Sequence, residues 1–181
     1  MTKVTIDLFD TTLRDGAQSL PHSNQFCDGT KHTIADTIAC LGIGVIEAGF
    51  PATPEDGQEV ARVAETVGQT SYDVATWNNA KRKGIMGKTP IIAGLSRATE
   101  GDISATWQAI QAATFPRIHT FISTSDFHRK HKFPGVSRQQ LLEIGVDAVK
   151  FAREISKDHS GVSVEFSAEA ASTTDSGYLQ Q

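Results

Sequence analysis

The sequence has few cysteines, no strong excess of either charge and no long apolar run. Its two cysteines, Cys27 and Cys40, show no metal-ligand spacing, and the pattern around Cys40 predicts a small buried residue on the apolar side of a helix. The formal net charge is -4 with both signs interspersed, and no apolar stretch approaches the roughly 20 residues that cross a bilayer. These absences leave neither cysteine as a strong candidate nucleophile, and they argue against nucleic-acid and membrane partners.

Length and composition are those of a globular protein with a real core. The chain has 181 residues, of which 39% are hydrophobic and 21% charged, so one domain is expected. The stretch from Met1 to Val4 enters a predicted strand at once, without the basic, apolar and small-residue regions of a signal peptide. We therefore expect a cytoplasmic protein.

Short apolar runs alternate with segments of helical periodicity along the whole chain, which predicts five strands and four helices. This alternation is typical of parallel βα units wound right-handedly and gives the fold class α/β. We expect a surface insertion at residues 69–89 and a polar, basic loop at 127–132. The predicted strands are residues 4–8, 45–50, 91–95, 117–122 and 162–167, and the predicted helices lie near 28–41, 55–67, 102–113 and 137–155.

Two predicted strands carry polar side chains where a core would be apolar. A lone charge at Glu47, inside a strand covered on both faces, costs several kcal/mol unless it is paired, so Glu47 should face a polar interior. In the last strand, Ser163, Glu165 and Ser167 alternate with apolar residues and should face away from the covering helices. Polar groups near the carboxyl ends of barrel strands are where such folds keep their chemistry.

The stretch Phe9–Gln18, which reads FDTTLRDGAQ, follows the first predicted strand directly. A guanidinium beside a carboxylate, here Arg14 and Asp15, can hold an anionic oxygen and a hard divalent cation together. The alternative interpretation of this pair is a surface loop that caps a helix.

These ten residues resemble the opening signature of the HMGL-like family of metal-dependent TIM barrels, which includes 2-isopropylmalate synthase, citramalate synthase, homocitrate synthase and 3-hydroxy-3-methylglutaryl-CoA lyase. Four further segments, at residues 47–52, 94–98, 119–126 and 164–169, resemble 2-isopropylmalate synthase in the same order. The resemblance implies a (β/α)8 TIM barrel, of which residues 1–181 are the N-terminal part of the domain with about the first five β-strands.

The resemblance also implies roles for the first two motifs. Arg14 would be catalytic and would hold the carbonyl and the developing alkoxide of a 2-oxoacid. Asp15 would bind a divalent metal, Mg or Mn, with Zn as a further possibility. Glu47 would orient Arg14 and is therefore included among the catalytic residues.

The fourth and fifth strands would supply the rest of the 2-oxoacid pocket. His119 and Glu165 match positions that line it, with Ser163 and Ser167 as weaker neighbours, and Glu165 is also expected to be catalytic. The implied reaction is attack of acetyl-CoA on 3-methyl-2-oxobutanoate to give 2-isopropylmalate in leucine biosynthesis, with a homodimer as the family's assembly. Citramalate synthase, homocitrate synthase and lyase-like cleavage are the alternatives within the family, and Asp15 argues against the second.

One element of the family pattern has no match. Two further metal ligands come from a His-x-His motif on the family's seventh strand, and no His-x-His occurs in this sequence. His128 and His131 are a weaker metal alternative, in a loop better explained as a solvated rim, with contact to CoA phosphate as another option. We therefore expect either a fragment of a longer gene product or a short form that pairs with another chain. A hypothesis of another class is a catalytically silent half-barrel that acts as an assembly module.

Overall fold

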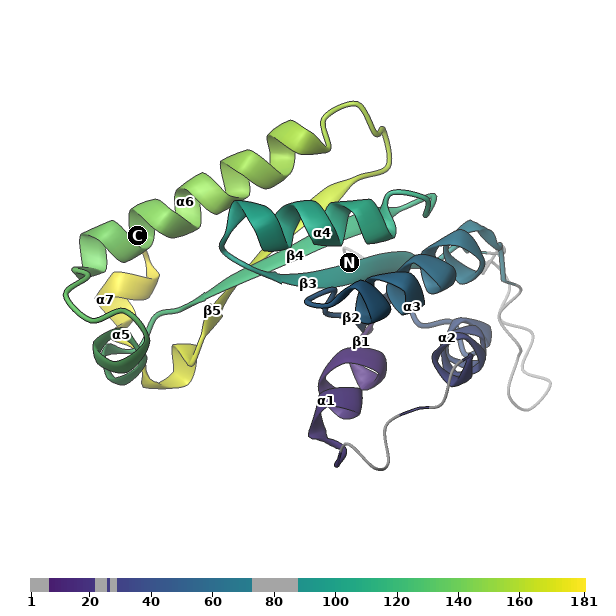
Figure 1. Ribbon diagram of the computed structural model, residues 1–181, viewed down its shortest axis with the longest axis horizontal. Helices are drawn as coiled ribbons and strands as arrows, with labels where there is room; N and C mark the ends of the chain where they lie inside the picture. The colour runs from purple at the N-terminus through teal and green to yellow at the C-terminus, as the bar shows by residue number, and fades with distance from the viewer. Residues whose placement is uncertain (1–6, 22–25, 27–28, 73–87) are drawn as a thin grey trace, which may run out of the picture.

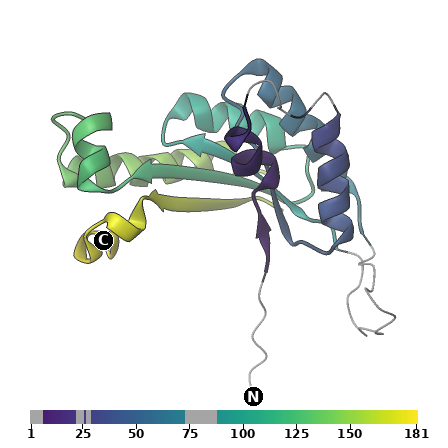
Figure 2. The same ribbon diagram turned by 90° about the horizontal axis from the view of Figure 1, so that it is seen from below.

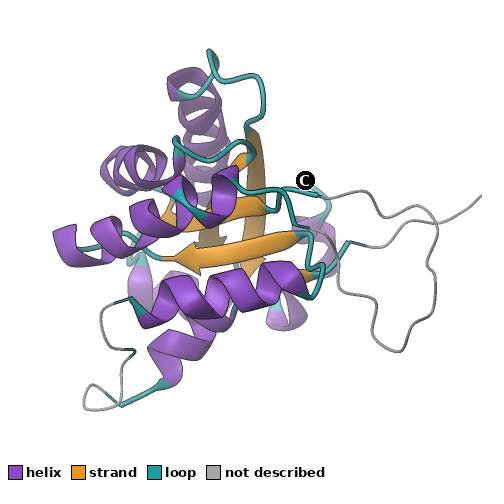
Figure 3. Cartoon of the chain, turned by 90° about the vertical axis from the view of Figure 1, so that its right-hand side faces the viewer, coloured by secondary structure: helices purple, strands orange, loops and turns teal. Residues whose placement is uncertain are grey.

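A computed structural model describes residues 7–21, 26, 29–72 and 88–181. Its centre is one five-stranded sheet in which every neighbouring pair is parallel and the strand order follows the chain. The sheet is curled, with helices stacked along its outside (Figures 1 and 3). The α/β fold class predicted from the alternating pattern is confirmed. The strands are β1 (Phe9–Asp10), β2 (Val45–Gly49), β3 (Ile91–Arg97), β4 (Pro116–Ser123) and β5 (Ser163–Glu169).

One helix follows each of the first four strands and packs on the outer face of the sheet: α2 (Thr30–Cys40), α3 (Pro54–Glu65), α4 (Glu100–Ile110) and α6 (Arg138–Ile155). Shorter helices lie between these units or follow the last strand. Among them, α5 and α7 lie at the carboxyl ends of β4 and β5 (Figure 2). The short helices are η1 (Thr12–Gly16), α1 (Ala17–Ser19), η3 (Val67–Gln69), α5 (Asp126–Lys132), η5 (Ala171–Thr173) and α7 (Ser176–Leu179).

The core lies between the sheet and these four helices. Ile46 of β2, Ile92 of β3 and Ile118 of β4 are completely buried in this core. Gly94 lets α4 approach closely, because a Cβ there would lie 2.8 Å from Cγ2 of Thr106. The strand residues that alternate with these point to the opposite, inner face, which is thereby left for polar side chains.

Local capping explains where the longer helices begin. At the predicted capping box, the Ser137 side chain accepts a hydrogen bond from the Gln140 backbone N–H, and the Gln140 side chain accepts one from the Ser137 N–H. Thr53 and Thr99 cap α3 and α4 in the same way, through the backbone N–H three residues on. These helices therefore begin close to where the sequence predicts them.

Three local expectations are wrong. Residues 127–132 belong to a helix, α5, rather than a loop, because Ser125 caps its first turn and four basic residues occupy its last turn, where the helix dipole favours positive charge. Cys40 is exposed and not buried, since it ends α2 where the helix leaves the core. The first strand also has other bounds: among the described residues it covers Phe9–Asp10, residues 7 and 8 of the predicted strand 4–8 precede it, and residues 4–6 lie outside the described residues.

The segment predicted as an insertion is only partly described. Its residue Tyr72 is buried, forms an antiparallel bridge with Lys88, and donates a hydrogen bond from its hydroxyl to Asp36 Oδ1 at 2.8 Å. Burial and the neighbouring Asp36 carboxylate together raise the pKa of Tyr72. Residues 73–87 lie outside the described residues, so the insertion stays a prediction. None of the helices in the described ranges combines the length and apolar character needed to cross a bilayer.

Candidate active site

The candidate site begins directly after β1, where the chain turns into η1. Three backbone N–H groups, of Arg14, Asp15 and Gly16, donate to the Thr11 carbonyl oxygen, which folds the chain into a tight turn. That turn points Arg14 back over the inner face of the sheet and leaves Asp15 at the rim, with its side chain 71% exposed. Arg14 NH1 donates to Asp15 Oδ1 at 2.8 Å.

Glu47 on β2 is the centre of the site. It is completely buried, and its two oxygens each accept one hydrogen bond of 2.6 Å, from Arg14 Nε and from His119 Nδ1. A register shift in the pairing of β2 with β3 falls next to it, between Glu47 and Gly49. The prediction that a buried charge at this position must be paired and face a polar interior agrees with this geometry.

His119 on β4 is held from both of its ring nitrogens. Nε2 lies 2.7 Å from Ser167 Oγ and 3.9 Å from Glu165 Oε1, while Nδ1 contacts Glu47. The ring of Phe9 packs edge-on against the imidazole with centroids 6.0 Å apart. A carboxylate oxygen can only accept, so Nδ1 carries a proton toward Glu47, and Nε2 is left to the Ser167 hydroxyl. The imidazole plane is therefore fixed before any ligand arrives.

Arg117, two residues before His119 on the same face of β4, holds the fifth strand's polar residues. Its Nε donates to Ser163 Oγ and its NH1 to Glu165 Oε2, each at 3.0 Å. The register explains these contacts, since Arg117 is paired with Ser163 and His119 with Glu165. Sequence reasoning missed Arg117, although its position two residues before His119 is the signal that could have found it.

A second cluster, which the sequence analysis also missed, lies further along β4 and β5 at their carboxyl ends. Glu169 accepts hydrogen bonds from the Ser123 hydroxyl and from Lys132 Nζ, the latter at 2.8 Å. Lys132 Nζ also donates to Ser123 Oγ at 3.0 Å. The next residue, Ala170, has left-handed backbone angles with φ 61°, which is uncommon for a residue with a side chain. Glu169 is thus a fixed carboxylate at the rim, beside α5.

Ion pairs hold the first residue of α5, Asp126, in place. Hydrogen bonding from Arg138 to Asp126, the first residue of α5, keeps the pKa of that carboxyl below its ordinary value. Arg138 NH2 lies 2.7 Å from Asp126 Oδ2, and Arg129 Nε approaches Oδ1 of the same carboxylate at 3.3 Å. These contacts join α5 to the start of α6.

A hollow of about 610 Å³ adjoins Arg14 between the turn after β1 and the start of α3. Leu13, Phe26 and Phe50 supply apolar surface, while Gln18 and Lys31 add polar groups. Its size is that of a small-molecule pocket. The guanidinium of Arg14 is therefore reachable from the carboxyl-end side of the sheet.

The structure joins all seven site residues predicted from the sequence into one chain of contacts. From Asp15 the contacts run through Arg14, Glu47 and His119 to Ser167 and Glu165, and Arg117 links Glu165 to Ser163.

The structure supplies only part of the predicted divalent-metal site. Within the described ranges, no group of three or more His, Cys, Asp and Glu side chains is placed to hold a metal ion, so Asp15 supplies a single carboxylate and does not complete a site. His128 and His131 instead pack their rings near Phe127, with the His131 and Phe127 centroids 4.6 Å apart. No such metal cluster forms around them among these residues.

Comparison with known proteins gives consistent matches along the chain. The family model described as HMGL-like matches residues 5–181. The chain is 41% identical over 177 residues to 2-isopropylmalate synthase 2, chloroplastic, of Arabidopsis thaliana, and 42% identical over 175 residues to 2-isopropylmalate synthase of Thermosynechococcus vestitus. The alignments cover 97% and 96% of this chain but 25% and 28% of those relatives, so the chain spans about a quarter of their length.

Proposed function

Since this chain belongs to the HMGL-like family, we propose that its residues form the 2-oxoacid-binding portion of a 2-isopropylmalate synthase site. The reaction would be the condensation of acetyl-CoA with 3-methyl-2-oxobutanoate. The single observation that carries the proposal is the Arg14–Glu47–His119 arrangement, in which one buried carboxylate on β2 holds a guanidinium from the turn after β1 and an imidazole from β4. A guanidinium held in this way stabilises negative charge that develops on a substrate oxygen.

Arg14 is the proposed ligand for the 2-oxoacid. Its Nε is occupied by Glu47 and its NH1 by Asp15, which fixes the plane of the guanidinium. Within the described residues, the second terminal nitrogen is left to donate to the keto oxygen and to the alkoxide that forms from it. Because the guanidinium stays protonated throughout, it can stabilise the oxyanion without losing a proton.

His119, Ser167 and Glu165 are the proposed wall of the pocket on the far side of Arg14. The Ser167 hydroxyl and the Glu47 carboxylate fix the imidazole, and Arg117 holds the Glu165 carboxylate 3.9 Å from it. We assign Glu165 as the polar group nearest the bound substrate on β5, with Ser163 supporting it through Arg117.

The family implies a divalent metal and acetyl-CoA, and we propose Mg or Mn as the metal. Such an ion withdraws charge from a keto carbon. Asp15 would supply one of its ligands, and the residues described here do not complete the set. We therefore assign no step of the reaction to the metal.

Ligand binding and turnover test separate parts of this proposal. Isothermal titration calorimetry should show that the 181-residue chain binds 3-methyl-2-oxobutanoate. Arg14→Met should weaken this affinity at least tenfold. Arg153→Met is the matched control, because Arg153 is exposed on α6 and should leave the affinity unchanged. Equal affinities of the two variants would refute the role of Arg14.

Release of free CoA from acetyl-CoA, with Mg or Mn present and Asp15→Ala as the control, tests catalysis. Turnover that depends on Asp15 supports the synthase proposal. Binding without turnover supports the alternative that the incomplete metal-ligand set favours, a catalytically silent half-barrel that retains a ligand site.

A further inference from the structure

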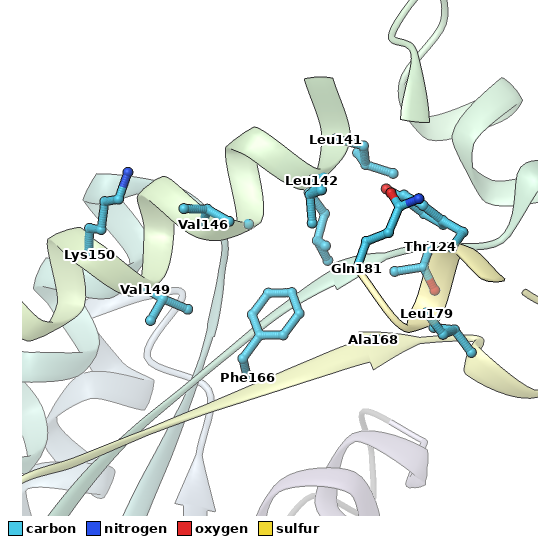
Figure 4. A pocket seen from close by; sticks show the side chains of 13 residues that line it. Thr124, Leu141, Leu142, Val146, Val149, Lys150, Phe166, Ala168, Leu179 and Gln181 are labelled. Carbon is cyan, nitrogen blue, oxygen red and sulfur yellow. The ribbon is translucent and has the colours of Figure 1, made fainter. Parts of the chain in front are cut away.

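The two faces of β5 differ in character. On the outer face, Phe166 points toward α6, where Val149 and other apolar side chains line a groove (Figure 4). Because side chains alternate along a strand, Glu165 and Ser167 point to the opposite, inner face. Both lie next to the His119 imidazole of β4. The inner face of β5 thus brings a carboxylate and a hydroxyl to the same ring.

The Glu165 carboxylate lies between two groups of β4. Its Oε2 accepts a hydrogen bond from Arg117 NH1 at 3.0 Å, while its Oε1 lies 3.9 Å from His119 Nε2. The strand register places His119 directly opposite Glu165, and Arg117 opposite Ser163. The carboxylate therefore turns away from the residue directly opposite it and binds the arginine two residues earlier on β4.

Ser167 takes the ring nitrogen that Glu165 leaves. Its Oγ lies 2.7 Å from His119 Nε2. Two groups of β5 are thus within reach of one nitrogen, and Arg117 selects between them because it holds Glu165 Oε2. Arg117 is itself fixed by a second hydrogen bond, from its Nε to Ser163 Oγ at 3.0 Å.

We propose that Arg117 is a positioning residue, which holds the Glu165 carboxylate away from His119 and so leaves the imidazole with one proton, on Nδ1. Arg117 acts through Glu165 and needs no contact with a ligand. The inference rests on the proposed function for the place of His119 in a 2-oxoacid site, and it adds the charge state in which the imidazole meets its ligand.

The charges around the imidazole support this assignment. Among the described residues, carboxylates approach the ring from two strands, Glu47 of β2 and Glu165 of β5. Each has a guanidinium partner, Arg14 for Glu47 and Arg117 for Glu165. On β3, the residue that pairs with this position is the apolar Leu95. The two ion pairs balance each other, so no uncompensated negative charge draws a second proton to the ring.

These charges act at short range in a partly buried layer. The side chain of His119 is 9% exposed, that of Arg117 22% and that of Glu165 32%. Solvent and salt screen such groups less than fully exposed ones. Without Arg117, the Glu165 charge would be uncompensated and free to close the 3.9 Å gap to Nε2. The ring would then take a second proton between two carboxylates, and Ser167 would lose its contact.

Nitrogen-15 NMR of the histidine side chains tests this in the ligand-free chain. A ring with one proton gives two well-separated nitrogen resonances, whereas an imidazolium gives two that lie close together. His119→Gln assigns the His119 signals among the six histidines. We expect one proton in the wild type at neutral pH and two in Arg117→Met. The midpoint of the His119 titration should rise by at least about one pH unit, because an opposite charge within about 4–6 Å favours the protonated ring.

Arg153→Met is the matched control, since Arg153 is exposed on α6 and its loss should leave the His119 signals unchanged. Adding Glu165→Gln to Arg117→Met should return the ring to one proton, because the charge that draws the second proton is gone. Ser167→Ala keeps Arg117 but frees Nε2, and the ring should still carry one proton. This variant also decides the matter if circular dichroism shows that Arg117→Met does not fold.

Four outcomes would overturn the proposal. They are a wild-type ring with two protons at neutral pH, an Arg117→Met variant that titrates like the wild type, a double variant that keeps two protons, and a Ser167→Ala ring with two protons. Failure of the wild type to bind 3-methyl-2-oxobutanoate would instead count against the proposed function, and it would leave these NMR results unchanged.

Discussion

Removing the Glu47 carboxylate should destabilise the fold more than removing any exposed acid. Glu47→Ala would leave two groups without their partner, the Arg14 guanidinium, 19% exposed, and the His119 imidazole, 9% exposed. Breaking one side of a buried ion pair costs about 3–5 kcal/mol, a large part of the roughly 5–15 kcal/mol that stabilises a typical domain. With a urea dependence of about 2 kcal/mol per molar, the unfolding midpoint should fall by about 1.5–2.5 M.

Equilibrium urea unfolding followed by circular dichroism measures this change. Glu154→Ala is the control, since Glu154 forms only an exposed pair with Lys157 on α6 and should cost less than about 1 kcal/mol. Adding Arg14→Met to Glu47→Ala should recover part of the loss, because the unpaired charge is then removed, and the coupling between the two sites is expected within about 0.5–3 kcal/mol. A midpoint for Glu47→Ala that matches the Glu154→Ala control would refute the buried pairing.

Three further changes test other parts of the structure. Gly94→Ala should lower the melting temperature, at a cost of about 1–3 kcal/mol, because its Cβ would press on Thr106; unchanged melting would contradict the close approach of α4. Hydrogen bonding from Arg97 lowers the pKa of Asp102, so this pair stabilises the fold above about pH 4 and loses its effect as the pH falls through the lowered pKa. Asp102→Asn should therefore reduce the melting temperature at pH 7 and progressively less below pH 4, and a constant difference would argue against the ion pair. Ala170→Gly should raise the melting temperature, because glycine relieves about 1 kcal/mol of strain in the left-handed backbone at this position. A lower melting temperature of the variant would disprove that the backbone is strained there.

The sheet could be predicted from the sequence because its strands are short apolar runs bounded by glycine, proline and polar residues. The helix α5 could not, since a run of histidine, arginine and lysine looks like solvent-exposed loop, and its helical state depends on the Ser125 cap and the helix dipole. Cys40 shows a related limit: helical periodicity gives the face of a residue but not the point at which the helix leaves the core.

The candidate site, too, could be predicted only in part from the sequence. The chemistry-bearing residues Arg14, Glu47 and His119 could be picked out by motif, but the contact of Glu47 with His119 joins positions 72 residues apart and depends on the strand order. Arg117 was missed because an arginine at the start of a strand is read as a solvated end, whereas the pairing of β4 with β5 places it beside Glu165.

The strand order of the sheet also bears on how the chain reaches this structure. Every strand pairs with the strand before it, so no pairing has to wait for a distant segment. Loop closure is the slow part of forming non-local sheets, and successive pairing keeps each closure short. On the ribosome, where synthesis proceeds from the amino terminus, the turn that carries Arg14 can pack on Glu47 before β3, β4 and β5 have been made. The hydrogen bond between Glu47 and His119, in contrast, has to wait for β4.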